Sequence, residues 1–312
     1  MRERIVIALG GHALLRPGQL GTIEEQRRNL RDGLRGVAEL VRRGHPVAIT
    51  HGNGPQVGHM LIRAREARGK AYDLPLDVCV AQSQGETGYL IVQALKEQVK
   101  TPVVAFVTAV TVDRADPFLL KPTKPVGPAL SRSEADDLLR QGLIVAEDPG
   151  RGLRRLVPSP RPKRIVGIEP IGTLFENGVV VVAAGGGGIP VVDEGSGALT
   201  GIEAVIDKDF VATELAIALR ADRLLNLTAV ERVKLQFRTP QERDVETLTP
   251  EQAARYLAEG QFAEGTMGPK IEGALRFLAA NPRGCVDITT PEKTLEAWSG
   301  TAGTRIRKGE PP

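Results

Sequence analysis

Short apolar runs alternate along the chain with longer amphipathic stretches. The apolar runs suit strands that are buried on both faces, and the amphipathic stretches suit helices of several turns. The sequence therefore predicts repeated β-α units around a mostly parallel sheet, with helices on both of its faces. We expect strands at Arg4–Leu9, Pro46–Thr50, Val103–Val112, Val179–Ala183, Arg223–Leu227 and Gly284–Ile288. We expect helices at Thr22–Arg43 (opened by a Thr22/Glu25 capping box), Gly54–Arg68, Leu76–Lys100, Asp207–Ala221, Pro250–Glu259 and Gly268–Ala280.

The pattern changes between residues 113 and 168, where prolines concentrate among short polar segments. Such a stretch is either a disordered linker or a small inserted subdomain. The alternation of apolar and polar residues in Leu153–Ile165 favours an inserted, β-rich subdomain. We therefore expect one domain over residues 1–312, with a protruding subdomain at 113–168.

Composition narrows the function classes. The chain of 312 residues carries 41 Lys and Arg against 38 Asp and Glu, a net charge of +3, and only 4% aromatic residues. A nucleic-acid-binding protein would carry a basic stripe, so we expect no nucleic-acid partner. Two cysteines, Cys79 and Cys285, cannot form a disulfide framework, which indicates a reducing compartment. Gly10–His12 interrupt the first apolar run too early for a signal peptide or membrane span, so we expect a cytoplasmic protein without a membrane partner.

Glycine runs follow the predicted strands. Gly10 and Gly11 end the first strand, Gly52–Gly54 enclose Asn53 after the second, and Gly185–Gly188 follow the valine-rich strand. Ligands of open α/β sheets bind at the carboxyl ends of the strands, where glycine lets backbone N–H groups approach an anion. The runs therefore indicate a phosphoryl-binding edge, although any one of them could instead be a tight turn. The P-loop, dinucleotide and protein-kinase motifs are absent from the sequence.

Lysines in unusual positions are the second candidate feature. Lys208 and Lys270 each stand at a predicted helix start, where the helix dipole disfavours a cation. Lys124 lies in the predicted insertion, and Asp207 and Asp209 flank Lys208 and could hold its ammonium group. Most lysines are solvated surface residues, but a phosphoryl group in transfer needs fixed cations.

Motifs along the chain form a recognisable set. They are ALGGHALL, HGNGPQVG, PLDVCVAQSQGETGY, PTKPVGP, VPSPRPKRI, AAGGGGIPVV, GIEAVIDKDF, LTAVERV and GTMGPKIEGA. These motifs resemble those of the carbamate kinases, within the amino acid kinase family, nearly end to end. That resemblance implies a three-layer αβα sandwich with a mostly parallel sheet and a small protruding β-rich subdomain, assembled as a homodimer. It implies reversible phosphoryl transfer between MgATP and carbamate, giving ADP and carbamoyl phosphate, often used in arginine metabolism to make ATP. Mg²⁺ would be held through ATP/ADP phosphates and water, without protein metal ligands.

The resemblance also implies residue roles. Lys208 would contact the transferring phosphoryl group, Lys270 would bind nucleotide phosphates, and Asp209 would orient both lysines. Lys124 would close over the site from the subdomain. Residues implied for the acceptor and phosphoryl loops are Gly10, Gly11, His12, Gly52, Asn53, Gly54, Gly186 and Gly187. Residues implied for the nucleotide side are Leu227, Thr228, Ala229, Val230, Phe237, Met267 and Lys270, with a strand at Val233–Phe237.

Three departures from the family pattern leave the acceptor open. His12 replaces the usual Asn, Ala109 follows Thr108 where Gln is common, and Lys121 stands where Asn is common. His12 could bring pH dependence to ligand binding, or its ring could merely fill the site differently. The alternatives are a kinase for another small carboxylate- or carbamate-like acceptor, and an inactive sensor of nucleotide or carbamoyl phosphate.

Other residues of chemical interest have a simpler interpretation. His45, His51 and His59 show no metal-ligand spacing with the cysteines, and we expect a structural hydrogen bond from His51. The basic pairs and runs at 154–155 and 161–164 either form a solvated face of the insertion or meet phosphates when a lid closes.

Overall fold

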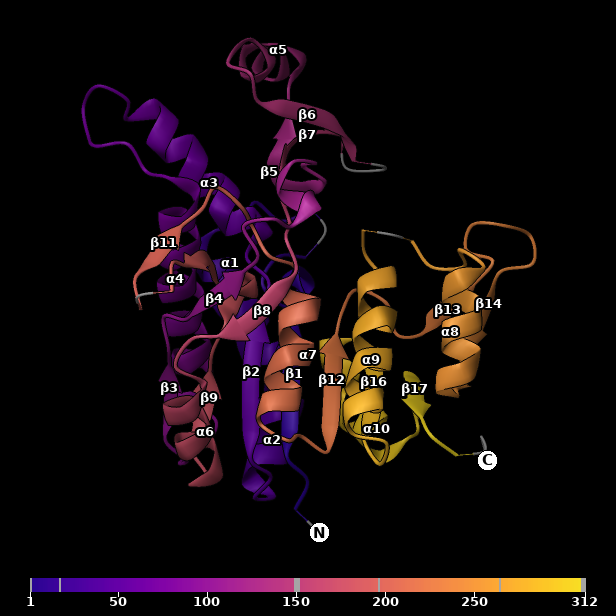
Figure 1. Cartoon of the computed structure of the whole chain (residues 1–312). Coiled ribbons are helices and arrows are strands. Elements are labelled where there is room, and N and C mark those ends of the chain that lie inside the picture. The colour runs from indigo at the N-terminus through magenta and orange to yellow at the C-terminus, as the bar shows by residue number, and fades with distance from the viewer. Residues whose placement is uncertain (1, 17, 149–151, 196, 264, 310–312) are drawn as a thin grey trace.

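The computed structural model describes residues 2–16, 18–148, 152–195, 197–263 and 265–309. A central sheet with strand order β15-β17-β16-β12-β1-β2-β9-β3 forms the middle layer of the molecule (Figure 1). Its strands are β1 (Ile5–Leu9), β2 (Val47–His51), β3 (Val103–Ala105), β9 (Val180–Val182), β12 (Arg223–Leu227), β15 (Thr247–Leu248), β16 (Cys285–Thr289) and β17 (Thr304–Arg307).

The pairing confirms the predicted, mostly parallel sheet. Strand β1 pairs in parallel with both β2 and β12, whereas β16 and β17 pair antiparallel. Leu9, the last residue of β1, lies opposite His51 of β2 and Leu227 of β12. The loops that follow these three strands therefore begin at the same edge of the sheet.

Side-chain alternation in the buried strands produces the layers. In β1, Ile5, Ile7 and Leu9 belong to one apolar cluster and Val6 and Ala8 belong to another. Because successive side chains point to opposite faces, a fully apolar strand fills a core on each side. The Ile5 side packs under α1 (Ile23–Gly33), α2 (Arg35–Arg42) and α4 (Leu76–Lys96), and the Val6 side under α6 (Ile168–Glu176), α7 (Lys208–Ala218), α8 (Pro250–Ala258) and α9 (Gly268–Ala280). The three-layer αβα prediction is confirmed.

The helix predicted for Thr22–Arg43 is wrong in one respect. Its capping box is present, with the Thr22 side chain accepting from the Glu25 N–H, but the segment divides into α1 and α2 at Leu34. Leu34 leaves the helical region with ψ near 2°. Close packing accompanies this break, because a side chain on Gly36 would lie 2.6 Å from Thr294 Cβ, at the start of α10 (Thr294–Ser299).

The single strand predicted for Val103–Val112 is also wrong. It divides into β3 of the central sheet and β4 (Ala109–Val112), which belongs to a second sheet. The break lies at Thr108, where the Gln84 side-chain amide accepts from the Thr108 N–H at 2.7 Å and donates to its carbonyl at 3.0 Å. The Thr108 carbonyl also accepts from the Ile189 N–H of β10 at 2.9 Å, so the chain enters the second sheet directly after the break.

The second sheet lies beside the carboxyl edge of the first, with the order β11-β10-β4-β8. Its strands besides β4 are β8 (Pro162–Ile165), β10 (Ile189–Asp193) and β11 (Leu199–Gly201). The strand expected at Val233–Phe237 is β13 (Val233–Leu235), which pairs with β14 (Arg243–Val245) as a separate two-stranded sheet beside β17. Short 3-10 turns complete the chain at η1 (Gly11–Ala13), η2 (Pro117–Leu119), η3 (Gly185–Gly187) and η4 (Pro291–Lys293).

A small sheet projects from the rest of the molecule at the top of Figure 1. This protruding sheet consists of β5 (Lys124–Leu130), β7 (Gly152–Val157) and β6 (Ile144–Asp148), with α5 (Arg132–Arg140) beside it. It lies inside the predicted insertion, and β5 packs on α3 (Gly54–Glu66). Contact is closest at Gly58 and Gly127, since a Cβ on Gly58 would lie 1.8 Å from Gly127 Cα.

Among the described helices we find none that combines the length and apolar character needed to cross a membrane.

Candidate active site

The loops after β1, β2 and β12 meet at the carboxyl edge of the sheet. The Gly10 N–H donates to the Leu227 carbonyl at 2.6 Å, which joins the first loop to the end of β12. A Cβ on Gly52 would lie 3.3 Å from Lys208 Cδ and 3.7 Å from Gly11 N. The absence of side chains therefore lets Lys208 lie between the first two glycine loops.

Asp209 joins two buried lysines at this edge. Lys208 Nζ lies 2.5 Å from Asp209 Oδ1, and Lys270 Nζ lies 2.8 Å from Asp209 Oδ2. The exposed fractions of the Lys208, Asp209 and Lys270 side chains are 13%, 6% and 8%. Lys208 opens α7 and Lys270 lies in the first turn of α9, so the packing of these two helices fixes both ammonium groups.

Lys124 reaches the same cluster from the protruding sheet. Its Nζ lies 2.6 Å from Asp207 Oδ2, while Asp207 Oδ1 accepts from the Asp209 N–H at 2.9 Å as the N-cap of α7. The sequence suggested that both Asp207 and Asp209 hold Lys208. In the structure Asp209 pairs with Lys208, and Asp207 pairs with Lys124 because the N-cap conformation turns the Asp207 carboxylate toward it.

Burial and charge act together on these groups. Burial by itself would raise the pKa of Asp209, but Lys208 and Lys270 outweigh it and hold that pKa below its ordinary value. Burial lowers the pKa of Lys208, and the charge of Lys270 lowers it further against the opposing effect of Asp209. The cluster places three ammonium groups against two carboxylates, which leaves it able to stabilise an added anion.

The run Gly185–Gly188 is buried, and packing explains its composition. Added Cβ atoms on Gly185 and Gly186 would lie 2.1 Å from His51 Nε2 and 2.0 Å from Asn53 Nδ2. Gly186 also has a φ of +67°, which favours glycine. The tight-turn interpretation therefore accounts for these glycines, and phosphoryl binding by Gly186 and Gly187 stays a prediction.

Gln84 is a site residue to which sequence reasoning gave no role. Its side-chain N–H₂ donates at 3.0 Å to both the Thr108 and Gly185 carbonyls, which joins α4 to the β3–β4 break and to η3. Asn53 donates to Ser83 Oγ of the same helix at 2.8 Å. Polar residues among the apolar positions of a long buried helix were the available signal.

The two histidines of the edge differ in environment. His12 lies within η1 and is half-buried. His51 is buried, and its Nδ1 lies 3.0 Å from the Gly52 carbonyl, which it meets as an N–H donor. Burial lowers the pKa of His51 to about 4, and the nearby Lys208 adds to this effect. His51 is therefore neutral near pH 7, although its hydrogen bond to the Gly52 carbonyl opposes this lowering.

The residues expected on the nucleotide side lie at the end of β12 and in the loop after it, after β13, and at the start of α9. Leu227 ends β12 and is buried, the Thr228 N–H donates to the Thr289 carbonyl at 2.7 Å, and Met267 caps α9. Ala229 and Val230 continue the loop after β12. Phe237 follows β13 and is 50% exposed, with the Arg238 guanidinium 5.2 Å from its ring centroid. Nucleotide binding by this set stays a prediction.

No group of three or more His, Cys, Asp or Glu within the described ranges could hold a metal ion. Each carboxylate oxygen of Asp207 and Asp209 already accepts from a lysine or a backbone N–H.

Comparison with known proteins gives consistent matches over the whole chain. The sequence model of the amino acid kinase family matches residues 3–286. A protein called carbamate kinase from Pyrococcus horikoshii is 43% identical, covering 98% of this chain and 99% of the relative, and carbamate kinase 2 from Enterococcus faecalis is 42% identical, covering 96% and 97%. The solved structure of carbamate kinase from Giardia lamblia bound to AMP-PNP has a TM-score of 0.90 and 37% identity, covering 99% of each chain.

Proposed function

Because the chain belongs to the amino acid kinase family, we propose that it is a carbamate kinase, which transfers a phosphoryl group reversibly between MgATP and carbamate. The products are ADP and carbamoyl phosphate, and the cellular direction we favour is ATP synthesis. The observation that carries the proposal is the Lys208–Asp209–Lys270 cluster at the glycine edge, in a chain whose relatives are called carbamate kinases over nearly their full length.

The chemistry requires alignment and charge neutralisation. A carbamate oxygen attacks the γ-phosphorus of ATP, the new O–P bond forms, and the bond to the bridging oxygen breaks with its electron pair leaving on ADP. Carbamate is already an anion, so no proton has to be removed. Lys208 contacts the moving phosphoryl group, Lys270 binds the nucleotide phosphates, and Asp209 keeps both ammonium groups in place.

Lys124 supplies a third cation from the protruding sheet, which we propose acts as a lid. Mg²⁺ enters as part of the nucleotide substrate and is held through phosphate oxygens and water. The carboxylates of Asp207 and Asp209 support coordination of Mg²⁺ by the nucleotide and not by the protein, because each of their oxygens already accepts a hydrogen bond.

The remaining proposed contacts with substrate lie in the loops at the carboxyl edge of the central sheet. Gly10, Gly11, His12 and Gly52–Gly54 surround the acceptor and phosphoryl group, with Gly186 and Gly187 behind them. The nucleotide lies toward Met267 and the segment 227–230. We also propose a homodimer and a cytoplasmic location, and light scattering of the purified protein tests the dimer.

A second acceptor is favoured by one local feature. His12 lies in the η1 turn, directly after the Gly10–Gly11 backbone that meets Lys208 across Gly52. A ring in place of an amide changes the size and hydrogen bonds of an acceptor pocket there. Another small carboxylate- or carbamate-like acceptor is therefore the competing function.

Phosphoryl-donor profiling separates the two functions. The parent protein is mixed with ADP, Mg²⁺ and either carbamoyl phosphate or acetyl phosphate, and ATP formation is followed by luminescence. We expect rapid ATP formation from carbamoyl phosphate. Formation from acetyl phosphate alone favours the competing function, and ADP binding without ATP formation from either donor favours an inactive sensor. His12→Asn, assayed in parallel, tests whether His12 sets the choice.

A further inference from the structure

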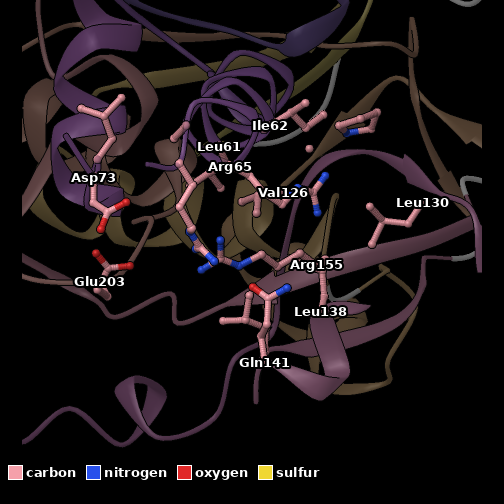
Figure 2. A pocket seen from close by; sticks show the side chains of 17 residues that line it. Leu61, Ile62, Arg65, Asp73, Val126, Leu130, Leu138, Gln141, Arg155 and Glu203 are labelled. Carbon is pink, nitrogen blue, oxygen red and sulfur yellow. The ribbon is translucent and has the colours of Figure 1, made fainter. Parts of the chain in front are cut away.

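A cavity of about 350 Å³ lies between α3 and the protruding sheet. Its lining includes none of Lys124, Lys208, Asp209 and Lys270. One wall comes from α3 and the loop after it, and the other comes from β5, α5 and β7 (Figure 2). A volume of this size suits a small organic molecule.

Two arginines from opposite walls meet in this cavity. Arg65 of α3 and Arg155 of β7 point toward one another in Figure 2. Within the described ranges, neither side chain has a hydrogen bond or an ion pair, and the buried Nε of Arg155 has no partner. Arg68, a third cation of the lining, likewise has no side-chain partner among these residues.

The other basic residues of the segments 154–155 and 161–164 differ from Arg155, because each of them pairs with an acidic side chain. A carboxylate oxygen lies within 3.3 Å of the charged group of Arg154, Arg161, Lys163 and Arg164. Solvent exposure does not explain the exception, since Arg155 is half-buried. Burial lowers the pKa of the Arg155 guanidinium and outweighs the opposing charge of Glu203, while the charge of Arg65 adds a smaller lowering. Two like charges without hydrogen bonds in a partly buried space are costly unless an anion joins them.

The rest of the lining limits what that anion can be. Asp73 and Glu203 lie together at one end, so three arginines face two acidic side chains. The small positive excess suits one or two negative charges and disfavours a polyanion. Leu61, Val126 and Leu138 offer an apolar surface to a short carbon chain. Guanidinium groups bind carboxylates and phosphates through paired N–H donors.

We propose that this cavity binds a small organic anion whose carboxylate or phosphate group lies between Arg65 and Arg155. Such an anion joins β7 to α3. Strand β7 also pairs with β5, where Val157 lies opposite Lys124. Occupancy therefore steadies the strand that carries Lys124. The proposal concerns binding and does not depend on the reaction that the active site performs.

Isothermal titration of the full chain with succinate, and separately with inorganic phosphate, tests the proposal. Arg65→Gln and Arg155→Met are compared with Arg63→Gln, an exposed position on the same helix outside the lining. Lys208→Ala, titrated in parallel, separates this cavity from the active site. We expect at least one of the two anions to bind with an affinity that falls at least tenfold in both cavity variants. We expect no change of that affinity in Arg63→Gln or Lys208→Ala.

Three results would overturn the proposal. The first is the absence of saturable binding of either anion by the parent at millimolar concentrations, and the second is binding that the cavity variants leave unchanged. The third concerns folding, measured by thermal unfolding without anion. Removing a partly buried guanidinium that lacks hydrogen bonds should leave the Tm of Arg155→Met equal to or above that of the parent. A lower Tm would show that Arg155 stabilises the empty fold.

Discussion

Replacing Asp209 by asparagine removes the negative charge that joins Lys208 and Lys270. Both ammonium groups are then left almost fully buried, without their shared carboxylate. The asparagine carbonyl can still accept from one lysine, but its N–H₂ faces the other. We therefore expect Asp209→Asn to weaken both folding and phosphoryl transfer.

The expected loss of stability in Asp209→Asn follows from the burial of the Asp209 carboxylate and its two lysine partners. Removing one partner of a buried ion pair costs about 3–5 kcal/mol, and the remaining amide acceptor puts this case near 3 kcal/mol. At roughly 2 °C per kcal/mol for a chain of this size, Tm falls by roughly 6 °C. Displaced lysines also stabilise the transferring phosphoryl group less well, and we expect turnover to fall about a hundredfold, or 2.7 kcal/mol.

The pH dependence adds an independent signature. The folded state holds the pKa of Asp209 below the ordinary 3.8, because the two lysines outweigh the opposing effect of burial. An acid of this kind stabilises the fold fully above its unfolded pKa, and that stabilisation is lost as the pH falls further. The parent should lose stability below about pH 4, and Asp209→Asn should lose less over the same interval.

Thermal unfolding and the ATP-forming assay provide both measurements. Asp244→Asn is the matched control, since Asp244 lies 3.1 Å from Lys234 on the surface with 48% of its side chain exposed. A surface pair contributes about 0–1 kcal/mol, so this control should change little. If Asp209→Asn behaves like Asp244→Asn in both assays, the role assigned to the buried bridge is wrong.

Three further predictions test other parts of the account. Gly58→Ala places a Cβ 1.8 Å from Gly127 Cα and should lower the free energy of unfolding by about 1–3 kcal/mol. Gly172→Ala, whose Cβ makes an ordinary contact, should not lower it. Equal Tm values for the two variants would contradict the packing argument. His51 stays neutral in the fold, so the parent should lose up to about 1.4 kcal/mol per pH unit between pH 6.5 and 4, measured by urea unfolding. The free energy of unfolding of His51→Gln should lack this pH dependence between pH 6.5 and 4. An unchanged slope would show that another group causes it. Lys124→Met should lower turnover at least tenfold in the ATP-forming assay; unchanged turnover would exclude the protruding sheet from the site.

The buried strands and the glycine loops that follow them could be predicted because they are determined by residues close together in the sequence. Five-residue apolar runs such as Ile5–Leu9 are specified by their own residues, and parallel pairing then places Leu9, His51 and Leu227 at one edge. The positions of Lys208 and Lys270 at helix starts were equally readable from flanking residues. The candidate lysines therefore came from the sequence, although their roles stay predictions.

The failures have causes that are distant in the sequence. Val103–Val112 looks like one strand, and its break is set by Gln84, which lies on α4. Asp207 and Asp209 are equivalent by sequence, and the choice between them is made by the N-cap of α7 and the approach of Lys124 on β5. The Arg65–Arg155 cavity joins a helix to a strand and has no sequence pattern at all.

The role of Lys208 in a carbamate kinase reaction can be measured as the rate of ATP formation from ADP, Mg²⁺ and carbamoyl phosphate by the parent and by Lys208→Ala. We expect rapid ATP formation by the parent and at least a tenfold loss in the variant, about 1.4 kcal/mol or more in activation free energy. Lys96→Ala, which removes an exposed lysine in the last turn of α4, should behave as the parent. A Lys208→Ala turnover within tenfold of the parent, or a folded parent that forms no ATP, would contradict the account.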